Sequence, residues 1–347
     1  MMNIRERMEA FWSGERPDQI PYTIYQNEWR HTAHDPAWQG LYDKGLGVTW
    51  NRATFKETWP HVEVDEKQYR ENGRLILRRT LRTPIGDIYE TYIDGWHDKY
   101  YLETATDYAV MTYIVKNAEL EPAYDQFLAL DKEIAPHGIP LVALGRTPFQ
   151  VIQVDYAGLQ NFAYHLFDYQ SELQELYEAR LVNYRRAAEI VAAGPGRFVS
   201  VLENFTAESL GPKRFAEFLV PVYNELFPML RSAGKIVGTH YDGRLASCQH
   251  LIAEAPIDLI ESFTTHPEGD MTLTEARQVW PDKLLWSNIN VACYYLPPSE
   301  LRQLVLDRVA EAAPDGKRLA FEVSEQYPDN WPESLPIVLD ALAETRV

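Results

Sequence analysis

The feature that most constrains the fold of this chain is the repeated alternation of short apolar runs with longer stretches of helical periodicity. Most of the runs are continuously apolar, which is typical of strands that are buried on both faces of a parallel sheet. Eight such strands joined by helical crossovers predict an α/β fold, a single (β/α)8 TIM barrel. A doubly wound open sheet is the alternative, but no GxGxxG or GxxxxGK(S/T) motif follows any strand. The predicted strands are residues 20–25, 46–50, 139–144, 197–202, 235–239, 257–260, 283–287 and 318–323.

Residues 51–100 follow a different pattern, which predicts a β-hairpin insertion. Residues 61–69, 75–81 and 87–93 alternate apolar and polar side chains, and Asn72-Gly73 favours a tight hairpin turn. We therefore expect one domain over residues 1–347, a barrel that carries this aromatic-rich insertion. The tryptophans of the N-terminal third either pack a core or form an aromatic wall over a ligand pocket. Six of the nine lie in the first hundred residues: Trp12, Trp29, Trp38, Trp50, Trp59 and Trp96.

The charge balance argues against two classes of partner. The chain has 33 Lys and Arg residues against 51 Asp and Glu residues, so its formal net charge is -18. Proteins that bind nucleic acid or anionic membrane surfaces gain affinity from positive charge. We therefore expect no nucleic acid and no membrane partner. A homo-oligomer stays open.

The cysteine content and the apolar runs bear on location. Cys248 and Cys293 are the only cysteines, too few for a disulfide framework or a four-thiolate metal site, and neither has a visible neighbour that would make it reactive. The first residues contain no apolar signal-like run, and no stretch of about 18 apolar residues occurs. We therefore expect a cytoplasmic protein and two inert thiols.

Polar residues follow several of the predicted strands, where a (β/α)8 barrel carries its catalytic groups. His240 and Asp242 follow one strand and lie two residues apart, so in extended backbone their side chains point to the same side. Glu261, Asn288 and Glu325 follow three later strands. Imidazole and carboxylate ligands suit zinc. The alternative is that His240 and Asp242 bond to each other and cap a loop.

Five segments of the chain resemble the uroporphyrinogen decarboxylase superfamily. They are RERMEAFWSGERPDQIPY near the start, and SLGPKRFAEFLVPVYNELFPMLRSAGKIVGTHYDGRL, IDLIESF, KLLWSNIN and SEQYPDNWPESL further on. The resemblance runs through most of the chain and is strongest from about residue 197 to the end. It implies a single (β/α)8 barrel. It also implies an enzyme, because the superfamily contains decarboxylases and cobalamin-dependent methyltransferases that usually use zinc.

Two departures from the family patterns favour the methyltransferase branch and a changed metal site. The Arg-Gln-Ala-Gly-Arg run that grips the tetrapyrrole in the decarboxylase is absent after Pro21-Tyr22, where this chain reads TIYQNEWRHTAHD. The thiol-activating methyltransferases use a His-x-Cys pair and a distant Cys. His240 matches that histidine, Asp242 stands at the first Cys position, and Glu325 stands near the second, seven residues before Pro332. Carboxylates in place of thiolates leave a harder zinc ion, better suited to polarise oxygen.

The resemblance therefore implies a zinc-dependent methyltransferase that moves a methyl group from a methylated small molecule to the cobalt of a corrinoid. An aryl methyl ether is one candidate donor, which would make the reaction an O-demethylation. The implied zinc ligands are His240, Asp242 and Glu325, with Glu322 as the competitor of Glu325. Glu261 is expected as a catalytic fourth ligand that substrate displaces, and Tyr241 as a catalytic residue beside the metal. The residues expected to bind substrate are Glu203, Asn204 and Asn288.

Three alternatives remain open at this point. The chain could be a decarboxylase of a small acid that works without metal, or a barrel that only binds a ligand. A thiol-directed methyltransferase is disfavoured because both cysteine ligands are missing. The sequence contains no Asp-x-His-x-x-Gly corrinoid-binding motif, so cobalamin is expected on a partner corrinoid protein or as free cofactor. His97 and His266 are expected to be solvated loop histidines.

Overall fold

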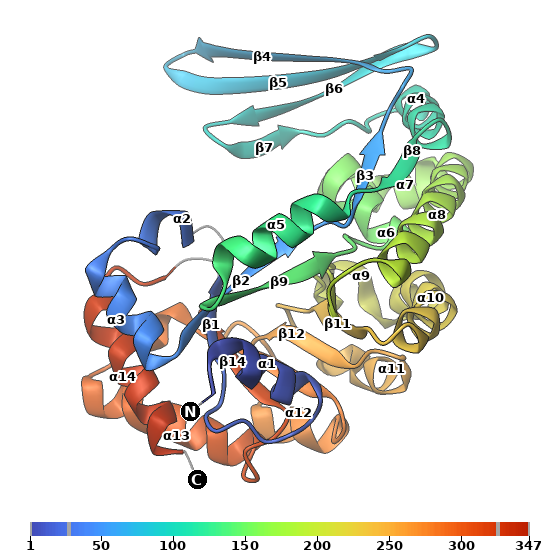
Figure 1. The fold of residues 1–347 in the computed structure, drawn as a ribbon. Coiled ribbons are helices and arrows are strands. Elements are labelled where there is room, and N and C mark those ends of the chain that lie inside the picture. The colour runs from blue at the N-terminus through green and yellow to red at the C-terminus, as the bar shows by residue number, and fades with distance from the viewer. Residues whose placement is uncertain (1, 26–28, 324–326, 346–347) are drawn as a thin grey trace. The chain divides into compact units, whose positions relative to one another are not determined.

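The computed structural model describes residues 2–25, 29–323 and 327–345 (Figure 1). The chain divides into two compact units. The first contains Met1–Thr54, Ala123–Gly145 and Val191–Val347, and the second contains Phe55–Pro122 and Arg146–Ile190. The second unit therefore includes the predicted hairpin segment together with a later stretch of chain that the sequence does not set apart.

The first unit is built on a closed barrel of eight parallel strands, as the apolar runs predict. The strands follow one another around the barrel in the order β1-β14-β13-β12-β11-β10-β9-β2. Each predicted apolar run coincides with one of them, so the α/β barrel is confirmed. The strands are β1 (Tyr22–Tyr25), β2 (Leu46–Arg52), β9 (Gly138–Ala143), β10 (Phe198–Val201), β11 (Ile236–His240), β12 (Leu259–Phe263), β13 (Leu284–Ile289) and β14 (Leu319–Val323).

Helices and helical turns connect the strands of the barrel (Figure 1). Those of the first unit are α1 (Ile4–Trp12), α2 (Trp29–Thr32), α3 (Pro36–Lys44), α5 (Tyr124–Ile134), α9 (Ala207–Arg214), η3 (Phe215–Leu219), α10 (Val220–Ser232), η4 (Ala246–Cys248), α11 (Gln249–Glu254), α12 (Leu273–Val279), η5 (Val291–Tyr295), α13 (Pro298–Ala312) and α14 (Trp331–Glu344).

Helix α1 closes one end of the barrel with an apolar layer. The Asn3 side chain accepts a hydrogen bond from the backbone N–H of Glu6, and the Glu6 side chain accepts one from the backbone N–H of Asn3. The first turn therefore has a complete capping box. We call the buried layer under this helix the barrel floor. Gly47 lets the helix approach, because a Cβ there would lie 2.2 Å from Cγ1 of Ile4. The floor contains Ile4, Met8, Phe11, Trp12, Ile139, Leu141, Phe198, Leu259, Leu284, Trp286 and Ala320.

The second unit contains a four-stranded antiparallel sheet, β4-β5-β6-β7, which confirms the predicted hairpins. Its strands are β4 (Glu63–Glu71), β5 (Arg74–Thr83), β6 (Gly86–Ile93) and β7 (Trp96–Lys99). Asn72 and Gly73 both have positive φ, 50° and 82°, as expected for a two-residue hairpin turn. The other elements are β3 (Phe55–Thr58), paired with β8 (Glu119–Pro122), and the helices α4 (Ala105–Lys116), α6 (Pro148–Gln150), α7 (Gly158–Asp168) and α8 (Gln170–Ala193), with a π-helical segment, η2 (Val151–Ala157).

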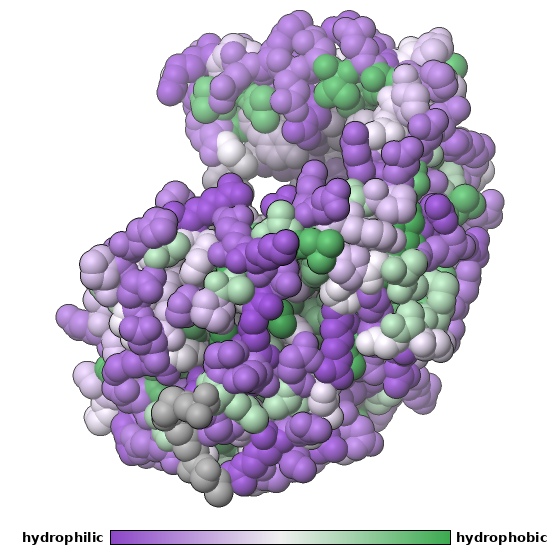
Figure 2. Space-filling model, viewed as in Figure 1, coloured by the Kyte–Doolittle hydropathy of each residue, from purple (hydrophilic) through white to green (hydrophobic). Residues whose placement is uncertain are grey.

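The surface is largely hydrophilic on the face that Figure 2 shows, with smaller apolar areas between the polar ones. Among the described residues, none of the helices combines the length and the apolar character that crossing a membrane would require.

Candidate functional site

Polar side chains occupy the inside of the barrel next to the floor. Residues two apart on a strand share a face, so the residue two positions after an inward-facing floor residue also points inward. On β11, a Cβ at Gly238 would lie 2.4 Å from the Phe198 ring, so Gly238 faces inward as well. The inward residues reached in this way are Ser200, His240, Glu261, Asn288 and Glu322. The carboxyl ends of the strands therefore point a polar set into the barrel, as the sequence predicts.

His240 lies between two carboxylates that approach opposite sides of its ring. Its Nε2 atom is 3.7 Å from Oδ2 of Asp242, and its Nδ1 atom is 4.0 Å from Oε2 of Glu261. The Tyr25 hydroxyl is 3.4 Å from the same Nδ1 atom. Because Asp242 and Glu261 face different ring nitrogens, an ion held by Nε2 and Asp242 would leave Glu261 on the other side of the imidazole. Glu261 is then placed to orient the ring, as carboxylates beside metal-bound histidines commonly do.

Glu261 is fully buried and only partly satisfied. Its Oε2 atom accepts a 3.0 Å hydrogen bond from the Ser200 hydroxyl, while Oε1 has no partner among the described residues. Burial raises the pKa of the Glu261 carboxyl above its usual range, against the opposing effects of His240 and Ser200. Glu261 therefore tends to keep a proton at pH values where an exposed glutamate has lost it.

Glu322 faces the inside of the barrel, an orientation that the sequence leaves open. It follows Ala320 of the barrel floor by two residues, is 1% exposed, and pairs in register with Asn288, so it faces the inside of the barrel. Both carboxyl oxygens are buried without a hydrogen-bond partner of normal geometry in the described chain. Burial and then the negative charge of Glu261 raise the pKa of Glu322 well above its usual range. Glu261 and Glu322 thus form a pair of buried carboxyls that oppose each other's ionisation.

The predicted ligand Glu325 lies outside the described residues, so its position relative to His240 is not defined. Among the residues that the structure describes, no group of three His, Cys, Asp or Glu side chains is arranged to hold a metal ion. The donor types nevertheless fit zinc. His240 and Asp242 supply an imidazole nitrogen and a carboxylate oxygen 3.7 Å apart, and the buried Oδ1 atom of Asn288 in the same cavity lining is an acceptor that a cation would satisfy.

Asn288 is held by a distortion of β12. Ser262 has φ 60°, unusual for a residue with a side chain, and the β12–β13 register shifts between Glu261 and Phe263. Nδ2 of Asn288 donates to the Ser262 hydroxyl at 2.7 Å and to the Thr264 hydroxyl at 3.1 Å. These bonds leave Oδ1 of Asn288 buried without a partner in the described chain, which suits the substrate-binding role predicted for it.

A cavity of about 200 Å³ adjoins His240 and Asp242. Its lining is polar and contains carboxylate, amide and hydroxyl groups but no lysine or arginine. A pocket of this composition favours a neutral or positively charged ligand over an anion. The lining residues are His240, Asp242, Ser262, Thr264, Glu268, Asn288, Asn290 and Val291.

Tyr241 and Glu203 belong to a different cluster. The Tyr241 hydroxyl donates to that of Tyr223 at 2.9 Å, and Tyr223 donates to Oε1 of Glu203 at 2.8 Å. All three residues are fully buried, and the Tyr241 ring packs against Phe205 and Phe215. The side chains of Tyr241 and Glu203 therefore hydrogen-bond within this cluster and do not face the His240 imidazole.

Asn204, in contrast, reaches the site from the loop after β10. Its Nδ2 atom donates to Oδ2 of Asp242 at 3.5 Å, and its backbone has φ 47°. This contact links Asn204 to the predicted metal ligand, so Asn204 is positioned to orient the Asp242 carboxylate.

Comparisons with known proteins support the fold. No family model matches the sequence, and no curated protein matches it. Among solved structures, the chain is similar to a methyltransferase from Methanosarcina mazei, with a TM-score of 0.59, 10% identity and coverage of 100% of both chains. A B12-independent methionine synthase from Shewanella sp. W3-18-1 gives a TM-score of 0.44 and 14% identity over 95% of this chain and 94% of that chain. At these identities the similarity to the first structure is one of architecture along the whole chain.

Proposed function

We propose that this chain is a methyltransferase that removes a methyl group from a methylated small molecule at the His240 end of the barrel. One observation carries the proposal: two buried acceptor oxygens near His240, Oε1 of Glu261 and Oδ1 of Asn288, have no hydrogen-bond partner in the described chain. Each such oxygen costs on the order of 1–3 kcal/mol if nothing satisfies it. The whole-length similarity to a solved methyltransferase supports the same reaction class.

In this proposal His240, Asp242 and a second carboxylate hold zinc, and the methyl acceptor is the reduced cobalt(I) of a corrinoid, carried by a partner protein or supplied as free cofactor. When bound, zinc would draw electron density from the methylated heteroatom. Glu325 stays our choice for the third ligand, and Glu322 is the alternative inside the barrel. Asn204 would orient Asp242, and Asn288 would accept a hydrogen bond from substrate.

The two buried carboxyls supply the proton that the reaction needs. A methyl ether that loses its methyl group leaves an alkoxide or phenolate oxygen, which must be protonated. The raised pKa values of Glu261 and Glu322 keep a proton available beside the site at higher pH than an exposed glutamate would. Aryl methyl ethers are therefore our first choice of donor.

The decarboxylase alternative receives less support from the geometry. A decarboxylase of a small acid must bind a carboxylate, and the lining of the cavity beside His240 offers no lysine or arginine for it. The buried pair Glu261 and Glu322 would repel a second negative charge.

The test compares metal content and activity in matched variants. Wild-type protein, His240→Ala, Asp242→Ala and Glu325→Ala are purified, loaded with zinc and desalted, and their metal is measured by mass spectrometry. His266→Ala is the control, because His266 is an exposed turn residue, as predicted. We expect about one zinc per chain in wild type and control and a loss in the other variants, with loss of cobalamin methylation from aryl methyl ethers. Full zinc in all the variants would overturn the ligand assignment, and no methylation by the wild type with any methylated donor would overturn the reaction.

A further inference from the structure

The second unit contains a cavity that shares no residue with the barrel site. It measures about 430 Å³, within the range of small-molecule pockets. One face of the four-stranded sheet and the segment η2 supply its walls. The lining residues are Trp59, Val64, Arg79, Glu90, Tyr92, His97, Tyr101, Asp155 and Tyr156.

Glu90 organises the polar side of this cavity from β6. It is 3% exposed, and its Oε1 atom accepts hydrogen bonds from Nη1 of Arg79 at 3.0 Å and from the Tyr101 hydroxyl at 2.8 Å. Its Oε2 atom lies 3.2 Å from Nε2 of His97 and accepts a longer bond, 3.4 Å, from the Tyr92 hydroxyl. His97, Tyr101 and Arg79 together lower the pKa of Glu90 against the effect of burial. The carboxylate is therefore ionised and fixed in place.

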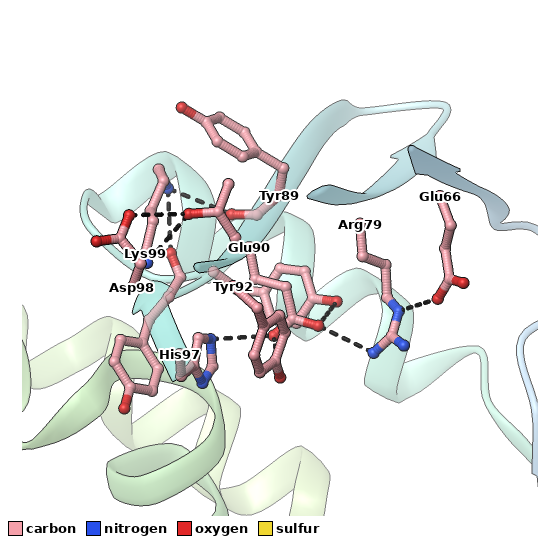
Figure 3. Close-up of polar contacts among 11 residues, drawn as sticks. Glu66, Arg79, Tyr89, Glu90, Tyr92, His97, Asp98 and Lys99 are labelled. Carbon is pink, nitrogen blue, oxygen red and sulfur yellow. Dashed lines mark hydrogen bonds and ion pairs between the residues drawn. The ribbon is translucent and has the colours of Figure 1, made fainter. Parts of the chain in front are cut away.

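Arg79 is held between the carboxylates of Glu66 and Glu90. Its Nε atom donates to Glu66, and its Nη1 atom donates to Glu90, as Figure 3 shows. Because two acids already compensate its charge, Arg79 offers oriented N–H groups to the cavity without making it positive overall.

His97 is part of an aromatic stack, which corrects the expectation that it is a solvated loop residue. It lies on β7, and its ring centroid is 4.4 Å from that of Tyr92 and 3.7 Å from that of Tyr100. The imidazole is thus fixed by two rings and by Glu90 (Figure 3).

Asp155 brings a further negative charge to the cavity from η2. Its carboxylate is 3.2 Å from Nη1 of Arg146 and is 43% exposed. A π-helical segment of this kind often marks a functional position. Among the charged lining residues, Glu90 and Asp155 outnumber Arg79, and one negative charge remains when the ion-pair partners Glu66 and Arg146 are counted as well.

We propose that this cavity binds a small organic cation of the methylated-ammonium class with a short polar tail. Four aromatic residues, Trp59, Tyr92, Tyr101 and Tyr156, line a space of net negative charge, and aromatic faces combined with carboxylates recognise quaternary ammonium groups. Arg79 lines the same cavity and would donate a hydrogen bond to an oxygen of the tail. The aromatic-rich segment of the sequence thus supplies a wall of a ligand pocket, while Trp12, Trp29 and Trp38 pack in cores.

The proposal is tested by calorimetric titration of the full chain with choline, with tetramethylammonium, and with the uncharged tert-butyl isostere of choline. Trp59→Leu and Asp155→Asn are the test variants. Trp96→Leu and Asp98→Asn are their controls in the same unit, because Trp96 is 80% exposed and neither residue lines the cavity. His240→Ala separates binding in the barrel from binding here.

We expect both cations to bind and the uncharged isostere to bind at least ~10-fold more weakly. Trp59→Leu and Asp155→Asn should each weaken choline binding by ~10-fold, while Trp59→Phe, the two controls and His240→Ala keep it near wild type. Equal affinity for choline and its isostere would overturn the proposal. So would no detectable binding of either cation by wild type, or a loss that follows only His240→Ala.

Discussion

Replacing Glu322 by glutamine should make the protein more stable at neutral pH and should flatten the dependence of its stability on pH. Glu322 is buried, its oxygens accept no hydrogen bond of normal geometry in the described chain, and its pKa is raised well above 4.5 by burial and by Glu261. Glutamine keeps the shape of the side chain and removes the ionisation.

The size of the effect follows from proton linkage. A carboxyl whose pKa is raised on folding contributes full stability below the pKa of the unfolded chain and loses it as pH rises through the folded pKa. Between those two values the folded protein holds a proton that the unfolded chain has released. Each pH unit in this window then lowers the free energy of unfolding by about 1.4 kcal/mol for one group.

Urea denaturation at several pH values between 4.5 and neutrality, with a metal chelator present, measures this slope. The wild type, Glu322→Gln and the exposed control Glu254→Gln are compared. Glu322→Gln should lose up to about 1.4 kcal/mol per pH unit of the wild-type slope, and Glu254→Gln should keep it. Equal slopes in all three proteins, or a Glu322→Gln protein that is less stable than wild type at neutral pH, would refute the reasoning about the buried pair.

Three further predictions concern the site and the fold. If the proposed function holds, Glu261→Gln should reduce methyl transfer by about 10²-fold or more without loss of zinc, because the proposed proton donor is removed; unchanged turnover in the cobalamin assay would contradict this. Phe11→Ala should destabilise the first unit by about 3–5 kcal/mol in chemical denaturation, because it empties part of the barrel floor; a loss under 1 kcal/mol would show that the floor collapses around the gap. Gly73→Ala should cost about 1 kcal/mol because φ is 82° there, and an unchanged melting temperature would argue against the two-residue turn.

The barrel could be predicted from the sequence because its strands are buried on both faces. Such strands appear as continuous apolar runs, and polar residues appear only where the run meets the carboxyl end, as at His240 and Glu261. The same pattern does not show whether Glu322 or Glu325 faces the site. Every residue of β14 is buried, so the strand has no alternation of apolar and polar side chains that would indicate its inward face. Only the register with Asn288 and the floor contact of Ala320 show that Glu322 faces inward.

The orientation of Tyr241 could have been predicted from the sequence, because side chains alternate along extended backbone. Neighbouring residues in extended backbone point to opposite sides, so Tyr241 and His240 are not expected to share one site. The structure follows this rule and directs Tyr241 to Tyr223 and Glu203. His97, by comparison, could not be placed from sequence. Its partners Tyr92 and Glu90 come from the neighbouring strand β6, and that pairing depends on the register across the turn at Asp94 and Gly95.

The arrangement of the barrel places two costly buried carboxyls directly beside a stabilising apolar layer. The floor buries an apolar layer under α1, and this packing contributes stability near the strand centres. Directly next to it, Glu261 and Glu322 are buried without lysine or arginine ion partners among the described residues. A fold selected only for stability would fill these positions with apolar side chains, because unpaired buried carboxyls are costly. The cost of burying these two carboxyls therefore offsets part of the stability that the floor contributes. In the proposed function the two carboxyls would hold a metal ion or a proton that is passed to the product.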